Sequence, residues 1–85
     1  MVSDTDYKRI CWHSRRGMLE LDLIMVPFVE QDFRSLPDAD QQRYIKLLEE
    51  EDTDMFRWFL KAELPGDPEL QRIVRLIIER HKARK

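Results

Sequence analysis

The stretch from Met18 to Val29 constrains the fold more than any other part of the chain. Its apolar side chains point in nearly every direction around a helix axis, so the helix has to lie in the middle of a domain or against a partner. Two carboxylates interrupt it, and Glu20 and Asp22 lie about 200° apart on the helical wheel. One polar face cannot hold both, and an unpaired carboxylate in apolar surroundings is costly. At least one of them therefore needs a specific role.

The residues just before this helix offer a local explanation. Arg16 precedes Glu20 by four residues, so the two side chains could form an ion pair at the helix entrance. If it is exposed, such a pair contributes only about 0.3–0.5 kcal/mol. Gly17 separates this helix from the preceding one, where the absence of a Cβ permits a positive φ or a close backbone approach. The segment from Arg15 to Asp22 is thus a candidate for recognition by a partner.

Length and composition predict one all-α domain. The chain has 85 residues, enough for a single small domain spanning 1–85, and its two glycines leave little material for strands and turns. The longest apolar run, Leu23 to Val29, is far shorter than the roughly 20 residues that span a bilayer, and the N-terminus does not resemble a signal sequence. We expect a cytoplasmic five-helix bundle that does not insert directly into a membrane.

Cysteine content and charge distribution narrow the classes of function. Cys11 is alone, which excludes an intramolecular disulfide and any multi-cysteine metal site, and we expect its thiol to be buried. Residues 38–63 hold eight acids and four bases, whereas residues 69–85 hold six bases and two acids. A basic end could contact nucleic acid or complement the dipole of a final helix. We favour the dipole interpretation and no nucleic-acid partner, because no aromatic or glycine-rich RNA-binding pattern accompanies the bases.

Capping residues divide the chain into five helices. The first should begin after Ser3, which has Asp6 three residues on, and should end near Ser14. The central helix should run from about residue 18 to residue 30 or beyond, with a kink or a short restart at Pro27. The inward face of the first helix is predicted to carry Tyr7, Ile10 and Cys11.

The third helix should open at Ser35, with Pro37 in its first turn and Asp38 completing the cap, and should end at the acidic run 49–52. Asp52 or Thr53 can cap the fourth helix, which should end at Pro65 and Gly66. Asp67 and Pro68 open the fifth. The predicted inward stripes are Tyr44, Leu47 and Leu48 on the third helix; Met55, Phe56, Phe59 and Leu60 on the fourth; and Leu70, Ile73, Val74, Ile77 and His81 on the fifth.

No motif in the sequence indicates catalysis. It contains no serine in a nucleophile elbow, no phosphate-binding glycine loop, and no His-x-x-x-His or Cys-x-x-Cys pair. We therefore interpret the chain as a binding protein rather than an enzyme, with His13 and His81 at surfaces or helix ends. Trp12 and Trp58 are expected in the core or at its rim, and the alternative for Trp12 is a partner-facing patch beside Arg15 and Arg16.

The segment Arg16-Gly17-Met18-Leu19-Glu20-Leu21-Asp22 resembles the Arg-Gly-x-x-Glu signature of small flavinylation factors for succinate dehydrogenase, known in mitochondria as succinate dehydrogenase assembly factor 2. The resemblance covers essentially the whole chain. The chain lacks the N-terminal extension of mitochondrial members, so it resembles a bacterial one. The supporting features are Trp12 upstream, Pro27-Phe28, Leu47-Leu48-Glu49 and Asp54-x-x-Arg57-Trp58.

This resemblance implies a five-helix protein, monomeric when free, that binds the flavoprotein subunit of succinate dehydrogenase and promotes covalent attachment of FAD to a histidine of that subunit. Related bacterial factors also serve the flavoprotein of fumarate reductase. The histidine and the flavin both belong to this client, so the factor itself binds no cofactor tightly and acts on FAD that the client holds. Its contribution would be to populate the client geometry that aligns the histidine with the flavin methyl carbon.

The resemblance also implies roles for single residues. Gly17 would let the client backbone approach closely, or else serve as a plain helix C-cap. Glu20 would accept hydrogen bonds from client groups near the flavin, or else pair with Arg16. The predicted partner-binding residues are Arg16 and Asp22, which would orient Glu20 or bind at the rim, Gly17, Glu20, and on the preceding helix Arg9 and Trp12.

Two other functions stay open at this point. One is an antitoxin or regulatory partner of a small membrane-associated toxin, a label that relatives of the family have carried. The other is direct carriage of FAD, against which the sequence lacks a Gly-x-Gly-x-x-Gly loop at a strand-to-helix junction.

Overall fold

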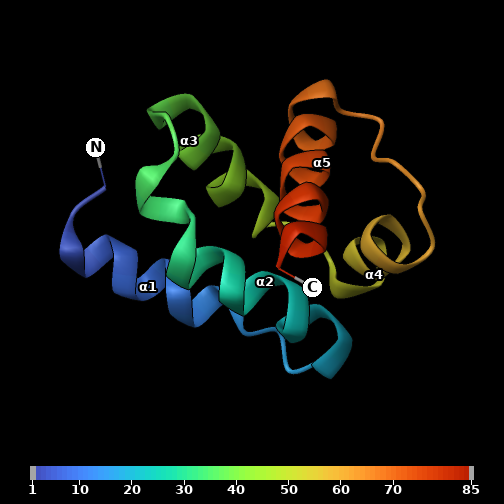
Figure 1. The fold of residues 1–85 in the computed structure, drawn as a ribbon, viewed down its shortest axis with the longest axis horizontal. Helices are drawn as coiled ribbons and strands as arrows, with labels where there is room; N and C mark the ends of the chain where they lie inside the picture. Colours follow the sequence, from blue (N-terminus) through green and yellow to red (C-terminus); the bar gives the residue numbers. More distant parts are fainter. Residues whose placement is uncertain (1, 85) are drawn as a thin grey trace.

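The computed structural model describes residues 2–84, and this part of the chain contains helices and no strand. The predicted all-α class with five helices is confirmed. Figure 1 shows α5 standing steeply across α2, with α3 beside it, α1 alongside α2, and α4 at the far side of α5. The elements are α1 (Asp4–Ser14), α2 (Leu19–Gln31), the short 3₁₀ helix η1 (Phe33–Ser35), α3 (Asp38–Leu47), α4 (Asp52–Leu60) and α5 (Pro68–Ala83).

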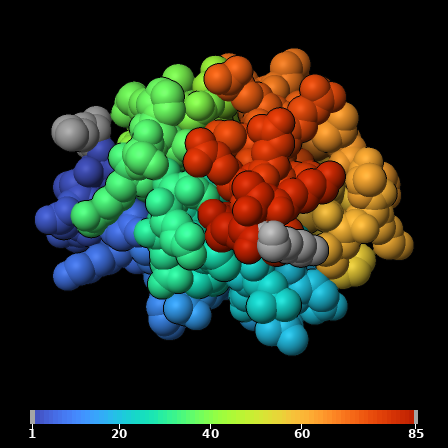
Figure 2. Space-filling model, viewed as in Figure 1, coloured from blue at the N-terminus to red at the C-terminus, as the bar shows by residue number. Residues whose placement is uncertain are grey.

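The apolar helix α2 lies in the middle of the fold, as its sequence predicts. It packs against α1, α4, α5 and η1, and Phe28 lies 5.4 Å from the ring of Tyr44 on α3. Leu19 and Leu23 face outward from its first turns and stay exposed. In the space-filling view α5 covers the centre of the face shown (Figure 2), and its buried residues belong to the core cluster. The residues that α2 buries are Leu21, Ile24, Met25, Phe28 and Val29.

Local caps begin two helices where the sequence predicts them. The Ser3 hydroxyl accepts the N–H of Asp6 at 3.1 Å at the start of α1. The Asp67 carboxylate accepts the N–H of Glu69 at 2.8 Å, with Pro68 in the first turn of α5. Helix α2 continues without a break through Pro27, so the restart considered at that residue does not occur.

The prediction that Ser35 opens the third helix is wrong. Ser35 ends η1, and its hydroxyl donates to the carbonyl of Asp32 at 2.9 Å instead of capping a helix. Leu36 is extended, as the residue before a proline usually is, so α3 begins only at Asp38 after Pro37. The inward residues Tyr44, Leu47 and Leu48 are buried as predicted.

Helix α4 differs from its prediction at both ends. Its N-cap is Glu51, which makes no side-chain cap bond, so neither Asp52 nor Thr53 is the cap. It ends at Leu60 rather than at Pro65, because Ala62 adopts a φ of 57° and the chain turns there.

The buried face of α4 is also rotated from the predicted stripe. Met55, Trp58 and Phe59 are buried, whereas Phe56 is half-buried and Leu60 is exposed. Positions 55, 58 and 59 share one helix face, and Trp58 completes it. The prediction that Phe56 and Leu60 point inward is therefore wrong. On α5, the predicted residues Leu70, Ile73, Val74 and Ile77 are buried and His81 is half-buried.

A buried pair of hydroxyls ties α1 to α3. The Ser14 hydroxyl donates to the carbonyl of Ile10 at 2.8 Å, and the Tyr44 hydroxyl lies 2.6 Å from the Ser14 oxygen. Burial raises the pKa of Tyr44 above its ordinary value, so the phenol keeps its proton and can donate it to Ser14. Cys11, predicted to be buried, is half-buried against the core. Across residues 2–84, none of the helices combines the length and apolarity needed to cross a bilayer.

Candidate partner-binding surface

The predicted site lies where α1 ends and α2 begins. Residues 15–18 form the α1–α2 connection, at the lower edge of the molecule in Figure 1. Trp12, Leu19 and Leu23 are 75%, 68% and 59% exposed, so three large apolar residues near these two helix ends face solvent. Leu19 and Leu23 are one turn apart on α2, and Glu20 beside them is also exposed. We call Leu19, Glu20 and Leu23, which share one side of the first turns of α2, the exposed patch.

Glu20 is left available to a partner. Within the described chain its carboxylate makes no hydrogen bond or ion pair, and the alternative pairing with Arg16 is not formed. An exposed charge without an internal partner contributes little to the free energy of unfolding, so removing Glu20 should not destabilise the fold. Its contact with a partner stays a prediction.

Gly17 has a φ of 79°, a conformation that L side chains rarely adopt. Helix α1 ends at Ser14 and its C-cap is Arg15, so Gly17 turns the α1–α2 connection and is not a plain C-cap of α1. A Cβ at this position would meet nothing within 4 Å. The surface over Gly17 is therefore open, as the predicted close approach of a partner requires.

Arg16 points into the protein, and its side chain is only 16% exposed. Its guanidinium donates to the carbonyls of Leu48 at 2.9 Å and Glu50 at 2.7 Å, and to the carboxylate of Asp52 at 2.7 Å. It also donates to the carbonyl of His13 at 3.2 Å. The arginine of the signature thus joins the α1–α2 connection to the residues that link α3 and α4.

Asp22 also holds the α1–α2 connection in place. Its half-buried carboxylate accepts the backbone N–H of Arg16 at 2.8 Å. The two carboxylates that interrupt the apolar helix therefore differ in their surroundings. Asp22 is used inside the molecule, and Glu20 faces solvent.

The predicted residues on α1 lie on one face. Arg9 precedes Trp12 by three residues, which places both side chains on the same side of the helix, and both are exposed. Trp58 is in the core as predicted, whereas Trp12 has the exposed position given as its alternative. His13 is exposed at the end of α1.

A shallow hollow of about 400 Å³ brings several of these residues together beside the α1–α2 connection. Trp12, Arg15 and Arg16 are grouped by their closeness in sequence, whereas Leu48 and Asp52, on the other side of the hollow, are not predicted from the sequence. No local pattern could have linked them to Arg16, since they lie 32 and 36 residues further along the chain.

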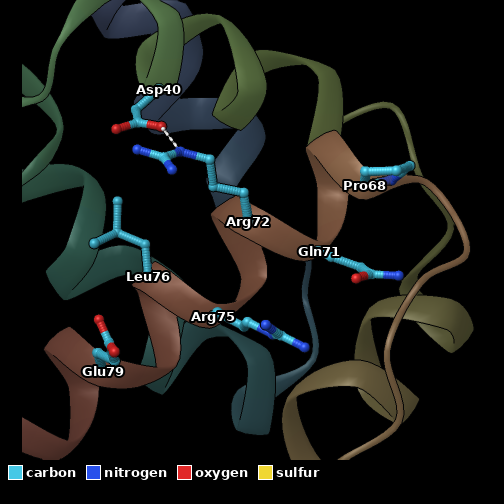
Figure 3. A pocket seen from close by; sticks show the side chains of 7 residues that line it. All are labelled: Asp40, Pro68, Gln71, Arg72, Arg75, Leu76 and Glu79. Atoms are coloured by element: carbon cyan, nitrogen blue, oxygen red, sulfur yellow. Dashed lines mark hydrogen bonds and ion pairs between the residues drawn. The ribbon is translucent and has the colours of Figure 1, made fainter.

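A second hollow, of about 410 Å³, lies over α5 and the start of α3, and Figure 3 shows the seven residues that line it. Arg72 points at Asp40 and donates to its carboxylate at 3.1 Å, and Arg43 donates to the same oxygen at 2.8 Å. Burial alone would raise the pKa of Asp40, but these hydrogen bonds outweigh it and lower the pKa below its usual range. The arrangement clamps α3 to α5 and needs no ligand to explain it.

Two bases of the C-terminal segment pair with an acid at the end of α2. Arg84 donates to the carboxylate of Asp32 at 2.6 Å, and Arg80 lies 3.6 Å from its other oxygen. These pairs favour a structural role for the basic segment over a nucleic-acid surface. Among residues 2–84 no cluster of three or more histidine, cysteine or acidic side chains is arranged to hold a metal ion.

A five-helix fold that exposes the Glu20 carboxylate together with large apolar side chains, among them Trp12, Leu19 and Leu23, is typical of a small helical binding protein. The comparisons make the class specific: the chain belongs to the Sdh5 family, described as the flavinator of succinate dehydrogenase, whose profile matches residues 8–81. Members of this family are assembly factors and not enzymes.

Curated relatives cover nearly the whole chain. The FAD assembly factor SdhE of Pseudomonas aeruginosa is 52% identical over 80 residues, which are 94% of this chain and 95% of the relative. SdhE of Pseudomonas putida is 50% identical over the same shares of each chain. SdhE of Yersinia pestis is 47% identical over 76 residues, 89% of this chain and 86% of the relative.

Proposed function

We propose that this protein is an FAD assembly factor that binds the flavoprotein subunit of succinate dehydrogenase and promotes covalent attachment of FAD to a histidine of that subunit. The observation that supports a binding role is Glu20, an exposed carboxylate without an internal partner between two exposed leucines on the signature helix. Apolar side chains around a charge provide both burial energy and orientation when a partner covers them.

The factor acts by positioning the client. The attacking histidine and the flavin both belong to the flavoprotein, so the factor supplies no nucleophile and holds no FAD tightly. It binds the client in an arrangement that brings the histidine and the flavin methyl carbon together, which converts a rare geometry into a populated one. The flavoprotein of fumarate reductase is a second client, and the factor works as a cytoplasmic monomer.

The residues divide between contact and support. Glu20 accepts hydrogen bonds from the client, Gly17 lets the client backbone approach, and Arg9 and Trp12 extend the surface along α1. Arg16 and Asp22 hold the α1–α2 connection in shape, because their polar groups bind within the protein.

The experiment compares covalent flavin in the client by in-gel fluorescence after denaturation, which leaves only covalent flavin visible. Cells lacking the factor are complemented with wild type, Glu20→Ala or Glu30→Ala, the last being an exposed acid at the other end of α2. Wild type and Glu30→Ala should restore the band, and Glu20→Ala should not, although its free energy of unfolding stays within about 0.5 kcal/mol of wild type.

Two results would contradict this proposal and favour one of the alternative functions. Equally bright bands in every lane, the deletion included, would reject flavinylation for that client and favour the antitoxin alternative. Micromolar or tighter binding of FAD by the isolated factor in a fluorescence titration would favour direct carriage of the cofactor.

A further inference from the structure

The α1–α2 connection is held from the far side by α3 and α4. Arg16 lies at the ends of two helices, where it donates to His13 in the last turn of α1 and to Leu48, the C-cap of α3. Both are carbonyls at the negative ends of helix dipoles, which favour a cation. Its third carbonyl partner, Glu50, lies in the segment between α3 and α4.

These bonds leave Arg16 little capacity for a partner. The four hydrogen bonds can occupy four of the five N–H donors of a guanidinium. A bidentate contact with a client carboxylate would therefore require the internal network to open. The arginine of the signature acts inside the protein, in contrast to the neighbouring Glu20.

Asp52 provides the countercharge for this arginine. It is the first residue of α4, and within the described chain it is the carboxylate that forms an ion pair with Arg16. A guanidinium that is mostly buried against carbonyls alone would keep its charge uncompensated, which is costly. Since the other acceptors of Arg16 within residues 2–84 are backbone atoms, Asp52 is the acceptor side chain that a substitution can remove.

We propose that Asp52 is a positioning residue for client binding: by fixing Arg16 it sets the course of the α1–α2 connection, and so the orientation of Gly17 and Glu20 toward the client. This rests on the proposed function of the exposed patch. The chain of contacts runs from Asp52 to the Arg16 side chain, through the Arg16 backbone N–H to Asp22 on α2. Without Asp52 the α1–α2 connection would sample other conformations. The fraction of molecules in the conformation that binds the client would fall, and the apparent affinity would fall with it.

The test is a double-mutant cycle on the affinity of the factor for the flavoprotein subunit carrying noncovalent FAD. Asp52→Asn should weaken binding about tenfold, and it should cause no further loss in an Arg16→Met background, because Asp52 acts through Arg16. Asp54→Asn is the matched control. Asp54 lies in the same first turn with a side chain 35% exposed against 38% for Asp52, but it pairs with Arg57. Its effect should be small and independent of Arg16.

Two further readouts separate positioning from a general loss of structure. At saturating concentrations of the Asp52→Asn factor the flavinylation rate should return to the wild-type value, since only the population of the competent conformation has changed. Hydrogen exchange in the isolated variant should speed up at Gly17 and the residues around it, while the amides of α5 keep their protection.

Multiplicative effects of Asp52→Asn and Arg16→Met would overturn the proposal, because they would make Asp52 an independent contact. Wild-type affinity of Asp52→Asn, or an equal loss of protection throughout the molecule, would also overturn it. A wild-type factor that binds no flavoprotein would instead reject the proposed function. In that case the exchange measurement still decides whether Asp52 holds the connection, and unchanged exchange at Gly17 would show that it does not.

Discussion

At the scale of the single residue, Gly17 allows backbone conformation and surface chemistry to be separated. Its φ of 79° penalises any L side chain, whereas the space where a Cβ would sit is open. Gly17→Ala and Gly17→Arg should therefore lose similar stability, about 1 kcal/mol, because the cost comes from the backbone and not from a clash. Only the arginine is long enough to keep a client away from the surface.

The measurement is thermal unfolding of both variants together with covalent flavin in the client. We expect both to melt about 5 °C below wild type, a shift typical of this loss in a domain of this size. Gly17→Ala should retain flavinylation and Gly17→Arg should lose it. If the alanine variant were equally inactive, the shape of the connection rather than access to it would be the requirement.

The residues of the signature show what one sequence can and cannot reveal. The apolar context of Glu20 and Asp22 correctly indicated that at least one of them needs a specific role, and the positive φ considered for Gly17 is present. The partners of Arg16 could not be predicted, because helical spacing relates only residues three or four apart. The acidic side chain four residues on, considered as an alternative partner, does not pair with Arg16, and the observed partner lies 36 residues away.

At the scale of the element, prediction succeeded where the partner of a capping group was local. Ser3 and Asp67 bind N–H groups two or three residues ahead, so the sequence contains both halves of the interaction. Ser35 and Asp52 have the right chemistry for caps, but their oxygens are committed to Asp32 and Arg16. Residue type alone does not determine which of several possible hydrogen-bond partners a capping side chain binds.

Asp40 gives the clamp between α3 and α5 a definite dependence on pH. Its folded-state pKa is lowered, so its contribution to stability is complete above the usual aspartate pKa of about 4 and is lost as the pH falls through the folded value. Asp40→Asn removes the charge that Arg43 and Arg72 bind, and should cost about 2 kcal/mol at pH 7. The difference from wild type should shrink progressively below about pH 4.

Urea unfolding at several pH values measures this difference directly. Glu49→Gln is the control, because Glu49 is exposed just beyond the end of α3, and it should change the free energy of unfolding by no more than about 0.5 kcal/mol. A constant gap between Asp40→Asn and wild type from pH 7 to pH 3 would mean that the clamp does not depend on the charge of Asp40.

At the scale of the whole molecule, bases near the end of the chain form ion pairs with acids of earlier helices. The sequence shows acids concentrated in its middle and bases at its end, but not which of them meet. In the fold, Arg72 of α5 reaches Asp40 of α3, and Arg84, the C-cap of α5, reaches Asp32, the C-cap of α2. These pairs help to hold α5 against α3 and α2, and a charge count alone could not distinguish this from a surface for an anionic partner.

We expect one cooperative unfolding transition, in keeping with the single domain predicted from the sequence. The buried apolar residues of α1 to α5 form one cluster, so no helix has a separate core that could survive alone. Helix α4 is the element whose separate unfolding would be easiest, because it lies at the side of the fold (Figure 1). It joins the core through Met55, Trp58 and Phe59. Removing the exposed tryptophan by Trp12→Phe leaves Trp58 as a fluorescent reporter of α4, at little expected cost in stability.

In this variant, Trp58 fluorescence and helical circular dichroism at 222 nm should give the same urea midpoint and the same slope, about 1 kcal/mol per molar urea. Coincident transitions are expected because losing α4 exposes the faces of α2 and α5 that it covers, which destabilises the remaining helices at once. A fluorescence midpoint clearly below the midpoint from circular dichroism would show that α4 unfolds first. Asp52, the first residue of α4, would then leave Arg16 before the rest of the fold is lost, and the shape of the client-binding surface would depend on the local stability of α4.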